Sequence, residues 1–83
     1  MSDFFVGEVR AFPFGFAPTG WAPCEGQLLP ISPNAALFSL LGAMYGGDGR
    51  SSFALPALEP LPAQSGTLQY CIAVQGIYPP RPE

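Results

Sequence analysis

The chain has 83 residues, of which 11% are charged, against about 25% in an ordinary soluble domain. Its three cationic residues are all Arg, it has no His, and six acidic residues bring the net charge to −3. Because phosphate binding needs clustered Lys and Arg, this balance excludes a nucleic-acid partner and a polybasic membrane anchor. So few charges leave neutral or apolar surface, which usually belongs to an interface. The alternative to an interface is an ordinary small domain whose exposed apolar surface adheres to other molecules without specificity.

The length allows one small domain over residues 1–83 and no second core. A domain of this size buries only about 60% of its unfolded surface, so a lone monomer would be marginally stable. Eleven prolines restrict the unfolded chain and shift the balance towards folding. An oligomeric interface would shift it further.

No stretch approaches the roughly 18 consecutive apolar residues of a membrane span. The first eight residues lack the basic and apolar regions of a secretory signal, so we expect synthesis in the cytoplasm without a signal peptide. Cys24 and Cys71 could form a disulfide in an oxidising environment, whereas a cytoplasmic start favours two buried thiols. With no His, two thiols leave a zinc site two ligands short.

The predicted elements begin with a β-strand within residues 4–14, where Glu8 and Arg10 fall on one face at strand spacing. A Gly- and Pro-rich loop follows, and then two short strands, 21–24 and 27–29, around a turn. The residues expected on the apolar face of the first strand are Phe5, Val9 and Ala11.

A helix is predicted over residues 34–41, with Ser32 as its N-cap and Pro33 at its first position. It stops at Gly42, or one turn later at the glycine pair 46–47. The face expected to pack on the strands carries Leu37, Leu40, Leu41 and Met44.

The second half of the chain reads as a glycine-rich loop (44–50), an extended segment (51–56) and a linker (57–66). Residues 67–76 form the best strand, and their apolar character on both faces indicates a central strand or a subunit interface. An exposed Pro-rich tail (77–83) follows. The sequence therefore predicts a small α+β domain. Its expected core is Phe5, Val9, Trp21, Leu37, Leu40, Phe53, Ile72 and Val74.

Residues for catalysis are scarce. The absence of His removes the usual general base and the commonest metal ligand, and the absence of Lys excludes Schiff-base chemistry. Glu8, Glu25 and Asp48 are the remaining carboxylate candidates, and nothing in the sequence pairs two of them. We therefore expect no enzyme, no cofactor and no metal.

The segment Gly46–Arg50 lacks the spacing of a phosphate-binding loop and follows a helix instead of preceding one. A surface loop with glycines at positive φ, pinned by a hydrogen bond of Asp48 or Arg50, is the favoured interpretation. Trp21 and Tyr45 are candidates for contact with a sugar or peptide, although core packing is the commoner role of such side chains.

Several separate segments closely resemble the phage tail collar domain family, whose bacterial members are often called microcystin-dependent proteins. They occur in the family's order and span about residues 4–56, and residues 68–79 resemble the closing segment of these proteins. The matching segments are 7–10 (GEVR), 16–31 (FAPTGWAPCEGQLLPI), 34–42 (NAALFSLLG), 45–50 (YGGDGR) and 53–56 (FALP).

The middle of the chain departs from the family. There the FALP segment usually continues into Asp-Leu-Arg-Gly-Arg and a long variable insertion, whereas here 57–60 reads ALEP and only about a dozen residues precede Leu68. In tail-fibre relatives that distal region forms a receptor-binding head, in some cases with His-bound metal. What the resemblance implies here is the collar itself, which in fibre relatives is part of a trimer.

The resemblance implies a structural subunit of a phage or phage-like tail, in the tail tip, fibre or baseplate, located in the virion tail. Expected partners are further copies of the chain, with a trimer favoured, and other tail proteins. The alternative is a minimal adhesin for host attachment that recognises a surface glycan or protein. A remnant of a longer fibre gene is a weaker hypothesis, and a hydrolase the weakest. The candidate interface or receptor contacts are Trp21, Tyr45, Asp48, Arg50, Tyr78 and Arg81.

Overall fold

The computed structural model describes residues 4–13, 15–63 and 66–80, and these form a small α+β domain, as the sequence predicts. The elements in chain order are β1 (Val9–Phe12), β2 (Trp21–Pro23), β3 (Leu28–Pro30), the 3₁₀ helix η1 (Ser32–Asn34), α1 (Ala35–Leu41), β4 (Ser52–Ala54), β5 (Leu61–Ala63) and β6 (Gly66–Ala73).

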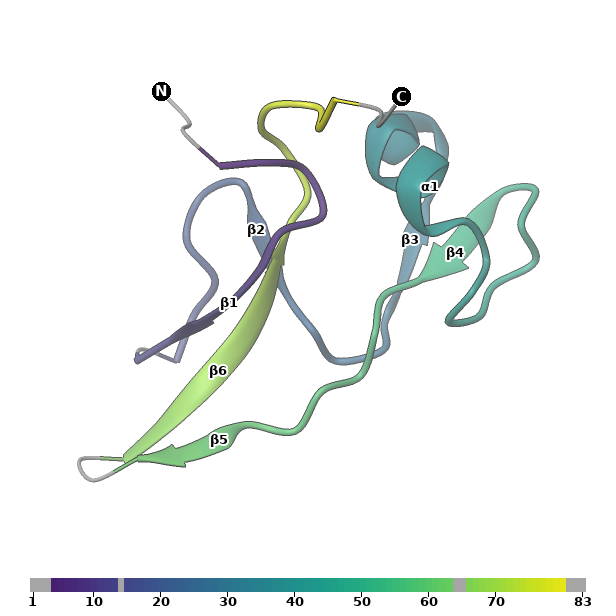
Figure 1. The fold of residues 1–83 in the computed structure, drawn as a ribbon. Helices are drawn as coiled ribbons and strands as arrows, with labels where there is room; N and C mark the ends of the chain where they lie inside the picture. Colours follow the sequence, from purple (N-terminus) through teal and green to yellow (C-terminus); the bar gives the residue numbers. More distant parts are fainter. Residues whose placement is uncertain (1–3, 14, 64–65, 81–83) are drawn as a thin grey trace.

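Strand β6 is the centre of the main sheet (Figure 1). Strand β1 pairs antiparallel with one part of it, with Val9 opposite Ile72. Strand β2 pairs antiparallel on the opposite side, and β5 pairs with the first residues of β6. Of the two interpretations of this apolar segment, a central strand or a subunit interface, the central strand is confirmed, because β1 and β2 pair with its two edges. Its two faces contribute to two different core clusters.

The second sheet contains only β3 and β4, which pair antiparallel with Leu29 opposite Phe53. The two predicted strands at 21–24 and 27–29 therefore exist as β2 and β3, but they belong to different sheets. The chain crosses between the sheets at Cys24–Gln27, where the Leu55 N–H donates to the Gln27 carbonyl at 3.0 Å. This crossing places β3 and β4 beside the main sheet (Figure 1).

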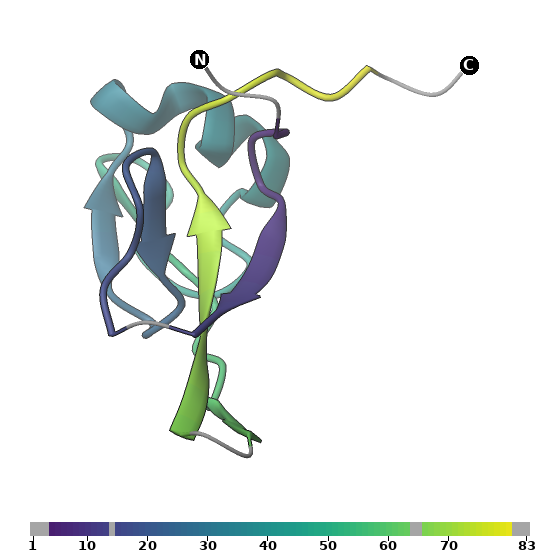
Figure 2. The same cartoon turned by 90° about the vertical axis from the view of Figure 1, so that its left-hand side faces the viewer.

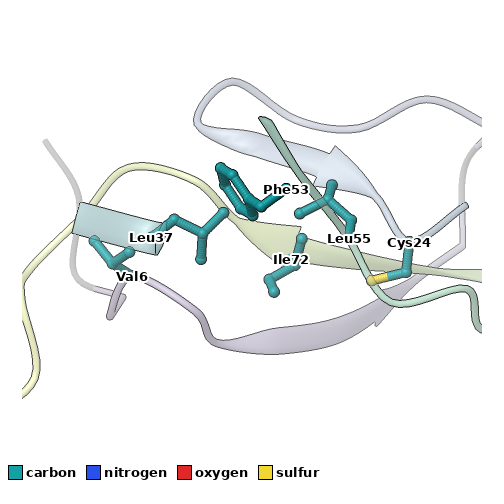
Figure 3. Close-up of a cluster of buried hydrophobic side chains, with 6 residues drawn as sticks. All are labelled: Val6, Cys24, Leu37, Phe53, Leu55 and Ile72. Carbon is teal, nitrogen blue, oxygen red and sulfur yellow. The ribbon is translucent and has the colours of Figure 1, made fainter. Parts of the chain in front are cut away.

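The main core cluster is enclosed by the main sheet, α1 and the segment of β4 (Figure 3). Along β6, successive side chains point to opposite faces. Ile72 points into this cluster, whereas Cys71 and Ala73 belong to a second cluster on the opposite face. The buried members of the main cluster are Val6, Cys24, Leu37, Phe53, Leu55 and Ile72.

The second cluster is built around Trp21, which is 8% exposed. The Phe4 and Phe12 rings lie at centroid distances of 4.9 and 5.1 Å from the indole ring, and the Phe12 contact is edge-on. The Arg10 guanidinium carbon lies 5.6 Å from the same centroid, within the range of a cation–π contact. Aromatic side chains therefore cover the face of β6 that the small sheet leaves open.

Three of the eight core predictions are wrong: Phe5, Val9 and Leu40 are exposed. The prediction for Phe5 fails because β1 begins at Val9 and not at Phe4, so the strand alternation does not reach Phe5, and Val6 is buried instead. Val9 shares the face of Ile72, but it lies outside the cluster that α1 and the small sheet cover. Trp21, Leu37, Phe53 and Ile72 are buried, and Val74 is partly buried against the main cluster.

The helix has the predicted end but a different beginning. Ser32 makes no capping hydrogen bond and instead opens η1, which precedes α1. The Asn34 side-chain amide donates to the Pro30 carbonyl at 2.9 Å, which holds this short 3₁₀ turn. Gly42 ends α1 with φ +60°, and its N–H donates to the Phe38 carbonyl at 2.7 Å. Of the predicted apolar face, Met44 lies beyond this end and is exposed.

The stretch 57–66, which we predict as a linker, contains β5 and runs into β6. Strand β5 and residues 66–68 of β6 form a hairpin, here called the arm, with Leu61 opposite Leu68. The arm projects beyond the other elements (Figures 1 and 2), and the molecule is elongated, with extents of 40 × 27 × 24 Å.

Leu55 and Leu28 provide a matched test of this core. Leu55 is 1% exposed within the main cluster, whereas Leu28 is 60% exposed on β3. We expect Leu55→Ala to lower the free energy of unfolding by about 2–5 kcal/mol, because it leaves a cavity, and Leu28→Ala to change it by less than about 0.5 kcal/mol. Urea unfolding measures both. Equal losses would contradict the assignment of the core.

Candidate functional site

The two terminal segments meet α1 at one end of the molecule (Figure 1). Phe5 pairs with Ile77 in a parallel bridge, and the Ser39 and Tyr78 hydroxyls lie 2.6 Å apart. On the adjacent side of α1, Leu40 reaches the backbone at Gly7. Four large apolar side chains with exposed fractions of 38–49% therefore share this end, here called the terminal patch: Phe5, Leu40, Ile77 and Tyr78.

Backbone hydrogen bonds hold the two terminal segments together. The Val6 N–H donates to the Ile77 carbonyl, and the Ile77 N–H donates to the Phe4 carbonyl, both at 2.9 Å. Gly76 permits this approach, since its φ is +140° and a Cβ there would lie 2.6 Å from the Phe4 oxygen. The patch is therefore built on paired backbone and not on two loose ends.

The Tyr78 hydroxyl anchors the C-terminal segment on α1. The Ser39 hydroxyl donates to the Ala36 carbonyl at 2.7 Å, so its single proton is committed within the helix. Tyr78 is then the donor in the contact with Ser39. This bond fixes the phenol ring over the helix while about half of the side chain stays exposed.

The glycine-rich loop is organised by the Asp48 carboxylate. It accepts hydrogen bonds from the backbone N–H groups of Arg50, Ser51 and Ser52 at 2.9–3.0 Å, and from the Ser51 hydroxyl at 3.0 Å. These bonds hold the pKa of Asp48 well below its usual range, because they favour the charged form. The expectation of a loop pinned by Asp48 is confirmed.

Gly47 shows why the loop needs glycine. Its φ is +88°, and a Cβ there would lie 2.5 Å from the Phe53 Cα and 2.7 Å from the Ser52 carbonyl oxygen. The loop backbone therefore lies directly against β4, and a side chain at this position would push it away.

The candidate contact residues lie in different parts of the molecule. Tyr45, Asp48 and Arg50 share the glycine loop or its entrance, and all three are exposed. Tyr78 belongs to the terminal patch, whereas the Trp21 ring is covered by Phe4, Phe12 and Arg10. Arg81 lies outside the described residues. Phe5 and Leu40 were expected in the core, and no sequence pattern indicated that they lie at the surface.

The two cysteines are fully buried free thiols. Cys24 belongs to the main cluster and Cys71 to the second cluster, on opposite faces of the main sheet. Burial raises the pKa of Cys24 to about 11, with a smaller contribution from Cys71, and burial also raises the pKa of Cys71. Both side chains therefore act as protonated, small hydrophobic groups at neutral pH.

A depression of about 470 Å³ lies between the β2–β3 crossing and the segment before β5. Its polar side chains are Glu25, Glu59 and Gln69, and no hydrogen bond joins the two carboxylates among the described residues. Within the same part of the chain, no three Cys, Asp or Glu side chains come close enough together to hold a metal ion. No described helix has the length and apolar character needed to cross a membrane.

Residues 7–60 match the phage tail collar domain family, which is more than half of the chain. The chain belongs to this family. The family assignment predicted from the sequence segments is thereby confirmed. No curated protein and no solved structure gives a significant match.

As a phage tail collar domain, the chain is a structural component of a phage tail of the tail-fibre type, and its family is a structural one. The matched region runs from Gly7 to Pro60, one residue before β5 begins. The glycine loop and α1 lie within it, whereas each core cluster also takes buried side chains from β6. Strands β5 and β6 lie outside it, and so do three of the four residues of the terminal patch: Phe5, Ile77 and Tyr78.

Asp48→Asn tests the role of the loop carboxylate. The low folded-state pKa means that Asp48 stabilises the fold fully above its ordinary pKa of about 3.9, and that this stabilisation declines as the pH falls below that value. We expect the variant to have a lower Tm than the unchanged protein at neutral pH, and the difference to shrink in acid. The exposed Glu59→Gln is the control and should leave Tm unchanged at neutral pH. A Tm difference for Asp48→Asn that is independent of pH would contradict this role.

Proposed function

We propose that the chain is a structural subunit of a phage or phage-like tail that acts through self-association, with a trimer favoured, and through contacts with other tail proteins. The observation that carries this proposal is the terminal patch. Its four side chains are large, neutral and about 40–50% exposed. Paired backbone holds the two terminal segments in place, and α1 carries Leu40. Fixed apolar surface of this kind is typical of protein interfaces.

The position of the patch suits a connector in a tail. Both terminal segments reach this end of the molecule (Figures 1 and 2), so a neighbouring subunit stacked there would cover the patch and meet both segments. Uncharged contacts also suit a chain with few charges, since no ion pair has to be desolvated at the interface. The identity of the tail protein that binds this patch would determine whether the chain belongs to the tail tip, the fibre or the baseplate.

The patch alone is too small to account for a stable assembly. Completing the burial of a half-exposed large apolar side chain contributes about 1 kcal/mol, so the four contribute about 4 kcal/mol. Association costs about 4–15 kcal/mol in lost freedom of motion. Stable self-association therefore requires at least one further contact surface.

The adhesin alternative would rest on Tyr45 and Arg50, the exposed side chains of the glycine loop region. The loop backbone is ordered by Asp48, so both side chains extend from a fixed platform. Binding of the isolated protein to host cells that is lost in Tyr45→Ala and Arg50→Ala would favour the adhesin. Co-purification with tail proteins and no cell binding would favour the connector.

Measurement of mass against concentration tests self-association. We expect the unchanged chain to form trimers at micromolar concentration in analytical ultracentrifugation. Ile77→Glu places a charge in the terminal patch and should raise the dissociation constant at least about tenfold, equivalent to about 1.4 kcal/mol. Leu28→Glu places the same charge on an exposed apolar side chain outside the patch and should have little effect.

A monodisperse monomer across the concentration range would contradict self-association. An equal effect of Ile77→Glu and Leu28→Glu would contradict the assignment of the interface to the terminal patch.

A further inference from the structure

The arm is a two-stranded projection. The last paired residue of β1, Phe12, lies opposite Gln69, so within the described part of the chain residues 66–68 of β6 pair only with β5. An isolated two-stranded hairpin is at best marginally stable in water, and it needs a third strand or packing on one face. The arm projects away from the remaining elements (Figure 2). Its stability therefore depends on what packs against it.

The strand register gives the arm one continuous apolar face. Leu61 lies opposite Leu68, Ala11 opposite Tyr70, and Val9 opposite Ile72, so these three cross-strand pairs share one face of the main sheet. At the Ile72 end this face is the main core, under α1 and the small sheet. The more open part of this face is here called the arm face: Val9, Ala11, Leu61, Leu68 and Tyr70, of which Tyr70 also packs against the main core.

The arm face carries no charge, and it is open to solvent at both ends. Val9 and Leu61 are each 41% exposed, and the three side chains between them are partly buried. The opposite face of the arm carries Thr67, Pro62 and Gln69, which alternate with the apolar residues. The arm is therefore amphipathic, like a strand pair that packs one face against a partner.

The total surface of the molecule is consistent with a missing partner. The solvent-accessible area is 5511 Å², whereas a compact protein of this mass exposes about 4,800 Å². The excess of about 700 Å² belongs to the whole chain, its terminal segments included, and it is of the same order as the roughly 800 Å² that each partner contributes to a stable interface. The projecting arm is one source of this excess solvent-accessible area (Figures 1 and 2).

The edges of the arm direct a partner to its face. Pro60 and Pro62 remove backbone donors from β5 and its approach, so a further strand cannot pair along the whole outer edge. The apolar face is therefore the surface of the arm that a partner can cover along its whole length.

We propose that the arm face binds a second copy of this chain. This inference rests on the proposed self-association and supplies the further contact surface that it requires. Every copy of the chain carries one exposed arm face. Another copy is a partner that is available to each arm in equal number. The arm face carries no charge, so it fits the uncharged apolar surface that every copy of this weakly charged chain also exposes.

Leu61→Glu and Thr67→Glu test this proposal, because they place the same charge on opposite faces of the same arm. Both side chains are exposed, so both variants should fold. In analytical ultracentrifugation of the full chain, we expect Leu61→Glu to raise the dissociation constant at least about tenfold, since it buries an unpaired charge in the contact. Thr67→Glu should change it by less than about threefold. Val9→Glu, at the other end of the arm face, should act like Leu61→Glu.

Near-ultraviolet circular dichroism of the Trp21 cluster verifies that each variant is folded. If Leu61→Glu fails to fold, Leu61→Ser and Thr67→Ser replace the charged pair, with the same order of effects expected. If the unchanged chain associates and the Leu61 and Thr67 variants associate equally well, the arm-face contact is overturned. Self-association itself is not contradicted by that result. An unchanged chain that stays monomeric would overturn both.

Discussion

The pairing of β6 is the constraint on which the rest of the structure depends. The strand has β1 on one side and β5 followed by β2 on the other, so strands from both ends of the chain are joined through it. Its alternating side chains place Ile72 in the main core and Cys71 and Ala73 in the second cluster. Both core clusters therefore depend on one strand, and both lose buried contacts if that strand is displaced.

Some of this architecture could be predicted from the sequence because local chemistry determines it. The apolar run of β6, the helix stop at Gly42 and the loop ordered by Asp48 depend on neighbouring residues. Strand β5 was missed because prolines 60 and 62 suppress the strand signal, and only its pairing with β6 makes it a strand. Phe5 was expected in the core, and Val6 is buried in its place, because the chain pairs with Ile77 before β1 begins, a contact between residues far apart in the sequence.

The candidate surfaces were harder to predict than the family. The collar segments are recognisable because they lie within residues 7–60, whereas the arm and Ile77 and Tyr78 lie beyond this region. Tyr78 was predicted as a contact, but its partners in the terminal patch could not be, since three distant segments converge there. The arm face becomes visible only when the register of β1, β5 and β6 is known. Two surfaces together can supply the contact area that the terminal patch alone lacks.

Amide hydrogen exchange along β6 tests this account most directly. The account predicts the slowest exchange at Cys71–Ala73, where β6 has partners on both sides and both faces are covered. It predicts faster exchange at Leu68, where β5 is the sole partner in the described part of the chain, and slowing of that exchange as rising concentration promotes association. Exchange at Cys71–Ala73 as fast as in the glycine loop, or exchange at Leu68 that is independent of concentration while the protein associates, would contradict it.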